Sequence, residues 1–160
     1  EALSISDRIA VIHDGKVEQV GEPKEIYTKP ANMFVANFIG TSSFLDGTAK
    51  DGVVTVLGKK KLTLPMKKDF DGKVKVSIRP EYVLLDDPKE GELSGTITLA
   101  TFLGDFMNYE IQLENKQIIE INEYTDHMDT VRRAGDLVSL NLMENRISIF
   151  DAQTEQSLMI

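Results

Sequence analysis

The sequence has no cysteine and no tryptophan among its 160 residues, and its basic side chains are outnumbered by acidic ones. The absence of cysteine excludes disulfides, thiolate metal sites and cysteine nucleophiles, and it fits a reducing compartment. No apolar run reaches the roughly 20 residues that a membrane-spanning helix needs. A net charge of −8 repels nucleic-acid phosphates and anionic lipids. Because of this charge we expect no nucleic-acid partner. With 41% hydrophobic residues and well-mixed charges, the chain should fold.

The chain starts in the middle of a helix-like pattern. It has no initiator methionine, and no capping residue precedes its first apolar positions. Residues 1–7 fit the last turns of a helix. We therefore expect the chain to be an excised part of a longer protein, with any catalytic chemistry upstream of it.

The pattern of the first forty residues is α/β. The tight-turn dipeptide Asp14-Gly15 separates two strand-like runs, and Asn32 is a good N-cap for a helix that Gly40 ends. The expected elements are strands at 8–12 and 16–20 and short helices at 24–28 and 33–39. Such a segment buries too little surface to stand alone. It must therefore pack on the rest of the chain, on a second copy, or on a longer parent protein.

After Gly40 the spacing changes to short alternating runs separated by Asp-Gly turns. Many short strands at close spacing indicate a small β-sandwich or barrel. The expected strands are 44–50, 53–57, 61–64, 74–78, 82–85, 95–102, 108–113, 117–121, 137–142 and 147–150. Residues 125–134 are neither strand-like nor clearly helical. The domain boundary is therefore expected near residues 40–43.

No pattern of residues indicates catalysis or a metal site. Gly52 to Lys61 lacks the glycine spacing and the hydroxyl residue of a phosphate-binding loop, so it is interpreted as a hairpin. The two histidines, His13 and His127, are far apart, and no strained Gly-x-Ser-x-Gly turn is present. We therefore expect no catalytic, nucleotide-binding or metal-binding residue in this chain.

Two charged strings remain. The lysines at 59–61 fit a solvated strand edge, where lysine discourages aggregation. The string Ile78-Arg79-Pro80-Glu81 ends a strand, because proline removes a backbone donor. Arg79 and Glu81 have two interpretations: a surface ion pair of little energetic weight, which the residues alone favour, or a rigid corner that presents both charges to a partner.

The same residues resemble a known family. The end of the ATP-binding subunit of an ABC importer resembles the following strings of this chain: Ser6-Asp7-Arg8-Ile9-Ala10-Val11-Ile12, Asp14-Gly15-Lys16-Val17-Glu18-Gln19-Val20-Gly21, Pro23 with Glu25-Ile26-Tyr27, Pro30, Asn32, and Phe34-Val35-Ala36 with Phe38-Ile39-Gly40. Ile78-Arg79-Pro80-Glu81, Phe102-Leu103-Gly104 and Ile149-Phe150-Asp151 are similar to the transport-associated OB (TOBE) module of such subunits.

The resemblance implies a mainly β fold, an OB-like small barrel or sandwich at 41–160, preceded at 1–40 by a short α/β remnant of a P-loop ATPase domain. It implies a non-catalytic regulatory and dimerisation region, whose parent subunit would bind ATP and Mg²⁺ and hydrolyse ATP; no cofactor is expected here. Candidate regulatory or interface residues are Arg79, Glu81 and Asp105.

The implied partners are a second copy of the chain, the membrane-spanning permease subunits, and a regulatory protein or small ligand. The implied location is cytoplasmic, on the inner face of the membrane. The solute would be a polyamine or iron(III). We expect residues 1–40 to pack across a dimer, with exchange of this segment between copies as one form of it. The alternatives are a small oxyanion-sensing module and a single-strand nucleic-acid-binding OB domain.

Overall fold

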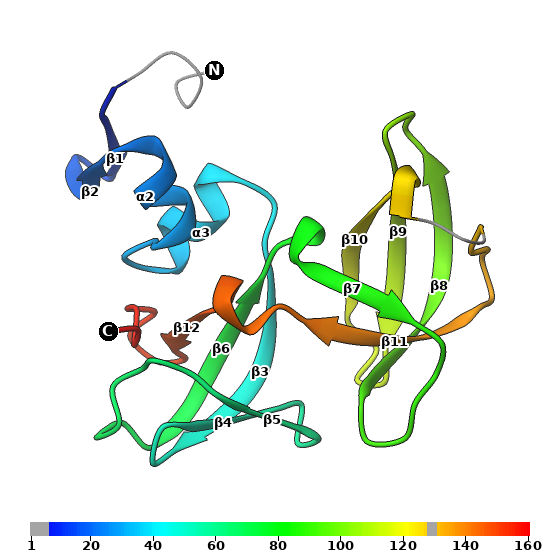
Figure 1. Ribbon diagram of the computed structural model, residues 1–160. Coiled ribbons are helices and arrows are strands. Elements are labelled where there is room, and N and C mark those ends of the chain that lie inside the picture. Colours follow the sequence, from blue (N-terminus) through cyan, green and yellow to red (C-terminus); the bar gives the residue numbers. More distant parts are fainter. Residues whose placement is uncertain (1–6, 128–130) are drawn as a thin grey trace.

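The computed structural model describes residues 7–127 and 131–160 (Figure 1). Within these ranges the strands form one two-stranded ribbon and two five-stranded sheets, and every pairing of strands is antiparallel. The sequence predicted helical turns at residues 1–7. Of these residues only Asp7 is among the described ones. None of the helices in the described ranges is long and apolar enough to cross a bilayer.

The ribbon and two short helices come first. Strands β1 (Ile9–His13) and β2 (Lys16–Gly21) pair across the Asp14-Gly15 turn, where both residues have positive φ, 51° and 75°. Helix α2 (Pro23–Thr28) begins with proline at its first position, and α3 (Met33–Ile39) is capped by Asn32, whose side-chain oxygen accepts from the Val35 amide at 2.9 Å. A small apolar cluster holds the unit together: Val11, Ile26 and Val35.

The first sheet has the strand order β12-β6-β3-β4-β5. Its strands are β3 (Ser43–Lys50), β4 (Val53–Val56), β5 (Lys60–Thr63), β6 (Gly72–Ile78) and β12 (Ser148–Asp151). Residues 52–61 form the β4–β5 hairpin, as the sequence predicted. Leu57 and Gly58 have positive φ in its turn. Strand β5 is an edge, where Lys59 and Lys60 pair with Glu114 and Glu92.

The second sheet has the order β10-β9-β8-β11-β7. Its strands are β7 (Val83–Asp86), β8 (Leu93–Phe102), β9 (Phe106–Leu113), β10 (Ile118–Tyr124) and β11 (Leu137–Leu142). The register of β8 against β9 shifts between Ile97 and Leu99, so that Leu99 is exposed although Ile97 is buried.

The chain crosses between the two sheets twice (Figure 1). It leaves the first sheet after β6 through the 3₁₀ turn η1 (Pro80–Tyr82) and enters β7. It returns from β11 through η3 (Glu144–Arg146) to β12. One hydrophobic cluster contains buried side chains of both sheets, including Val76 and Ile149 from the first and Ile111 from the second. The two sheets therefore share a core.

For most helices and strands, the expected first and last residues lie within two residues of those in the structure. Tyr82, expected in a strand, lies instead in η1 because Pro80 starts a tight turn. The stretch at 125–134 begins with the 3₁₀ turn η2 (Thr125–His127), and its residues 128–130 lie outside the described part.

Residues 7–40 pack on this chain's own β domain. The Met33 amide donates to the Glu155 carbonyl at 3.0 Å, and the Ser157 amide donates to the Ala31 carbonyl at 3.0 Å. Phe150 of β12 is fully buried on the sheet face opposite the shared core, with its ring 6.3 Å from that of Phe44. The structure thus shows the first of the three packing arrangements open to the segment.

Candidate functional site

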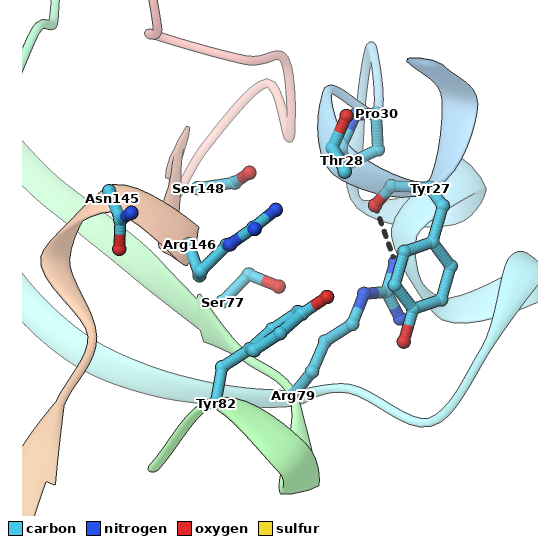
Figure 2. A pocket seen from close by; sticks show the side chains of 9 residues that line it. All are labelled: Tyr27, Thr28, Pro30, Ser77, Arg79, Tyr82, Asn145, Arg146 and Ser148. Atoms are coloured by element: carbon cyan, nitrogen blue, oxygen red, sulfur yellow. Dashed lines mark hydrogen bonds between the residues drawn. The ribbon is translucent and has the colours of Figure 1, made fainter. Parts of the chain in front are cut away.

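Arg79 sits at the exit of β6, where the chain leaves the first sheet. Its side chain points back toward α2 and is only 5% exposed. Nη1 donates to the Ser42 hydroxyl at 3.0 Å and to the Thr41 carbonyl at 3.3 Å. Nη2 donates to the Tyr27 carbonyl at 3.2 Å (Figure 2). One guanidinium therefore joins α2, the connection after α3, and the β domain.

Tyr27 of α2 is the shared partner of both charged residues in the Arg-Pro-Glu string. The Arg79 guanidinium carbon lies 4.0 Å from the centre of the Tyr27 ring, and the Tyr27 hydroxyl donates to the Glu81 carboxylate. Burial, followed by the hydrogen bond to Glu81, raises the pKa of Tyr27. Burial lowers the pKa of Arg79, although Tyr27 and Glu81 oppose that effect.

The surface ion pair favoured by the sequence is therefore wrong. Arg79 is buried, and it and Glu81 each bind Tyr27, a residue of the preceding unit. The string does form a rigid corner, but both charges are directed at this chain's own α2. We call the set Tyr27, Arg79 and Glu81 the junction.

Gly40 makes room for the junction. Its φ of −173° is extended backbone that any residue adopts, so conformation does not require glycine here. A Cβ at this position would lie 3.1 Å from Arg79 Nη1 and 3.2 Å from Tyr27 Cε2, so these side chains would have to shift by a few tenths of an ångström to admit it.

A cavity of about 30 Å³ lies beside the junction. Figure 2 shows Ser77, Arg146 and Ser148 directed from the β domain toward Thr28 and Pro30 on the facing segment. Antiparallel pairing of β6 with β12 places Ser77 directly opposite Ser148. Because paired residues share a sheet face, both hydroxyls reach the cavity. Its lining residues are Tyr27, Thr28, Pro30, Ser77, Arg79, Tyr82, Asn145, Arg146 and Ser148.

The lining is cationic and polar and contains no carboxylate. Ser77 and Ser148 are only 5% and 9% exposed, and their hydroxyls make no hydrogen bond within residues 7–127 and 131–160. Every fully enclosed side-chain polar atom in those ranges has a partner, so both hydroxyls are open to the cavity. The Arg146 guanidinium makes none there either and is held over the Tyr82 ring, 5.2 Å from its centre. The cavity therefore presents donors that the described chain leaves unused.

Asp105 is placed apart from the junction, on the exposed turn between β8 and β9 of the second sheet. Its carbonyl accepts from the Thr125 amide at 3.0 Å and the Thr125 hydroxyl at 3.1 Å. The neighbouring side chains of Phe102 and Leu103 are 67% and 54% exposed. The structure thus brings Arg79 and Glu81 together and leaves Asp105 in a different, apolar surface region.

The residues that sequence reasoning missed are Tyr27, Ser77, Arg146 and Ser148. For Ser77 the only signal is weak: strand alternation places it on the same face of β6 as Lys73 and Lys75, which marks that face as polar. Near Ser77 this face is covered by the segment that contains Thr28 and Pro30. The alternation along the strand does not predict this covering. No group of three or more His, Asp or Glu side chains positioned to hold a metal occurs in the described ranges.

Comparison with known proteins first defines the fold class. The chain is similar to the cytoplasmic molybdate-binding protein ModG in a molybdate-bound crystal structure, with a TM-score of 0.54, 16% sequence identity, and coverage of 67% of this chain and 94% of that one. At that identity the likeness establishes the fold alone, and the fold is mainly β.

The sequence comparisons then give the family. Residues 76–150 match the TOBE domain family. The chain is 36% identical over 163 residues to the Fe(3+) ions import ATP-binding protein FbpC of Fusobacterium nucleatum, covering 99% of this chain and 43% of that protein. It is 46% identical over 115 residues to the spermidine/putrescine import ATP-binding protein PotA of Borreliella afzelii, covering 71% of this chain and 33% of that protein.

The chain thus carries a TOBE domain and belongs with the C-terminal, TOBE-bearing part of ABC importer ATP-binding subunits. The chain spans less than half the length of each of these two ATP-binding proteins, FbpC and PotA.

Proposed function

We propose that this chain is the regulatory, non-catalytic part of the ATP-binding subunit of an ABC importer. ATP and Mg²⁺ would be bound and hydrolysed by the remainder of such a subunit, on the cytoplasmic face of a membrane complex with permease subunits. The relatives support an importer of iron(III) or a polyamine, since their names give these two classes of solute.

The observation that carries this proposal is the junction. Arg79, Tyr27 and Glu81 connect the family-typical segment that ends at Gly40 to the β domain through part-buried, charge-assisted contacts. Two packed bodies joined in this way move together. A displacement of the ATPase side would therefore reach the β domain, and a regulator bound to the β domain would bias the ATPase side in return.

The second part of the proposal is pairing with another copy. Two ATPase subunits that open after hydrolysis stay at high effective concentration if their β domains remain joined. Large apolar side chains are exposed at several places on the described surface, and two groups of them could each be covered in a two-fold dimer. They are Ile12, Val17, Val20 and Phe38 in the first forty residues, and Leu99, Phe102 and Leu103 at the end of β8.

A nucleotide-turnover assay tests the non-catalytic role. The purified chain is incubated with ATP and Mg²⁺, and released phosphate is measured against a buffer blank. We expect no release above the blank. Turnover that survives repurification and is lost on heat unfolding would contradict the proposal.

A second candidate function is the sensing of a small oxyanion. The observation that favours it is the cavity lined by Arg79, Arg146, Ser77 and Ser148 without a carboxylate. A thermal-shift screen with oxyanions tests it: a saturable rise in melting temperature supports sensing, and a flat response to every oxyanion contradicts it.

Binding of single-stranded nucleic acid is less well supported. The aromatic ring of Tyr109 in β9 is fully buried and cannot stack on a base, and the net charge of −8 opposes a phosphate backbone. Retardation of an oligonucleotide by the chain at low salt would revive this alternative.

A further inference from the structure

We infer that the cavity beside the junction binds one small tetrahedral oxyanion of the class of inorganic phosphate or sulfate, and that the ion bridges α2 to the β6–β12 edge of the first sheet. The inference rests on the second candidate function and adds to it the site, the size of the ligand and its effect on the junction.

The size of the cavity restricts the ligand. Its volume of about 30 Å³ exceeds the roughly 10–15 Å³ that one water needs. It is far below the roughly 300–1,000 Å³ of pockets for organic ligands. The space therefore suits an ion of a few heavy atoms and excludes a nucleotide or a polyamine.

The donors converge on this space from one side of the sheet. Ser77 and Ser148 are cross-strand neighbours, and within the described residues neither hydroxyl has a hydrogen-bond partner. The Arg146 guanidinium is likewise unbound there and is kept in place by the Tyr82 ring. A guanidinium and two hydroxyls match the acceptor oxygens of an oxyanion, and hydrogen bonds to a charged group are about twice as strong as neutral ones.

The charge balance favours an anion over water alone. The Glu81 carboxylate is engaged by the Tyr27 hydroxyl and does not line the cavity, so it compensates Arg79 rather than Arg146. No ion pair of Arg146 exists among residues 7–127 and 131–160. An anion here would face two guanidinium groups in a chain whose overall charge is −8, which is an unusual local excess of positive charge.

The position of the cavity gives the ion a mechanical role. Its walls come from two bodies: Tyr27, Thr28 and Pro30 from the first forty residues, and the serines and arginines from the β domain. A bound ion would add contacts across the same boundary that Arg79 already bridges. It would therefore stiffen the junction and report anion concentration to the ATPase side.

The test is a titration of the whole chain with sodium phosphate and with sodium sulfate, using sodium chloride at matched ionic strength as reference. Melting temperature and calorimetric heat are both followed. We expect saturable binding of phosphate or sulfate and no comparable response to chloride. Amide hydrogen exchange of residues 27–29 should slow on addition of the ion.

Three variants locate the binding. Arg146→Gln and Ser77→Ala should each weaken affinity by about tenfold, because each removes a donor to a charged ligand. Arg133→Gln is the control. It removes the same charge from an exposed arginine in the segment that precedes β11, and it should leave the affinity for the ion unchanged. Ser77→Ala is the safeguard in case Arg146→Gln disturbs the contact with Tyr82.

The outcomes are distinguishable. Loss of binding in Arg146→Gln and Ser77→Ala, with retention in Arg133→Gln, supports the inference. Saturable binding that all three variants weaken equally, or that none weakens, overturns the assigned site and leaves the sensing function standing. The absence of saturable binding by the unaltered chain overturns both.

Discussion

The Arg79 guanidinium carbon lies 4.0 Å from the centre of the Tyr27 ring, although the two residues are 52 positions apart in the sequence. This contact joins a short helix of the first forty residues to the strand end of the β domain. The behaviour of the junction therefore tests whether the two parts act as one body.

Removal of the Arg79 side chain should weaken the packing of the first segment on the β domain. Arg79→Ala deletes part-buried hydrogen bonds to Thr41, Ser42 and Tyr27 and removes a buried side chain that packs on the Tyr27 ring. We expect a loss of about 2–3 kcal/mol in the free energy of unfolding. Urea unfolding measures it, and limited proteolysis should show faster cleavage within residues 7–42.

Arg79→Lys is the matched variant. It keeps the charge but loses the planar fork, so it should recover less than half of that stability. A lysine variant indistinguishable from the original protein would show that charge alone matters, against the geometry described here.

Tyr27→Phe isolates the hydrogen bond to Glu81. Loss of the hydroxyl should cost about 1 kcal/mol at neutral pH, because the ring and its contact with Arg79 remain. Equilibrium unfolding of the two proteins at pH 7 provides the measurement. Equal stability would mean that the hydroxyl contributes nothing at the junction.

The same pair of proteins gives a pH prediction. The folded-state pKa of Tyr27 is raised above its unfolded value near 10.0, first by burial and then by Glu81. A raised pKa contributes stability that is fully present below pH 10 and is lost as pH rises above it. The advantage of the unaltered protein over Tyr27→Phe should therefore shrink between pH 9 and pH 11. An advantage that grows over that interval would contradict the direction of the shift.

Gly40→Ala should open the junction selectively. The added Cβ would lie 3.1 Å from Arg79 Nη1 and 3.2 Å from Tyr27 Cε2, so the ring or the guanidinium must move, at about 1–2 kcal/mol. Gly95→Ala is the control, because its Cβ would clash with Ile111 Cγ2 at 2.5 Å in the second sheet. Both variants should lower stability, but only Gly40→Ala should speed proteolysis within residues 7–42. The same cleavage pattern in both would mean that the junction is not a separate structural feature.

Most elements of this fold could be predicted from local pattern. Alternating apolar residues and Asp-Gly turns located the strands, and 137–142 agrees at both ends with β11. Asn32 and Gly40 marked the limits of α3, because capping is a property of a few adjacent residues.

The site could not be predicted in the same way, because it depends on contacts between distant segments. The burial of Arg79 follows from its packing on Tyr27, and the meeting of Ser77 with Ser148 follows from the pairing of β6 with β12. A strand pattern gives the face on which Ser77 lies, but not what covers that face. For the same reason the sequence favoured a surface ion pair where the structure has a buried bridge.

The exposed apolar side chains give a prediction about pairing. Phe102→Asp and Ile12→Asp each place a charge in one of the two exposed apolar regions, where the original side chains are 67% and 60% exposed. Only the variant whose region forms the dimer interface should become monomeric, because an unpaired charge in an apolar interface is costly. The oligomeric state is measured by size-exclusion chromatography with light scattering. If both variants pair as the original protein does, neither region is the interface.

Sedimentation equilibrium of the unaltered chain at micromolar concentration is the most direct test of the proposal that this region holds two subunits together. The account predicts a mass of two chains, each of 17.9 kDa, with a concentration-dependent equilibrium between one and two. A single species with the mass of one chain over the whole concentration range would contradict it.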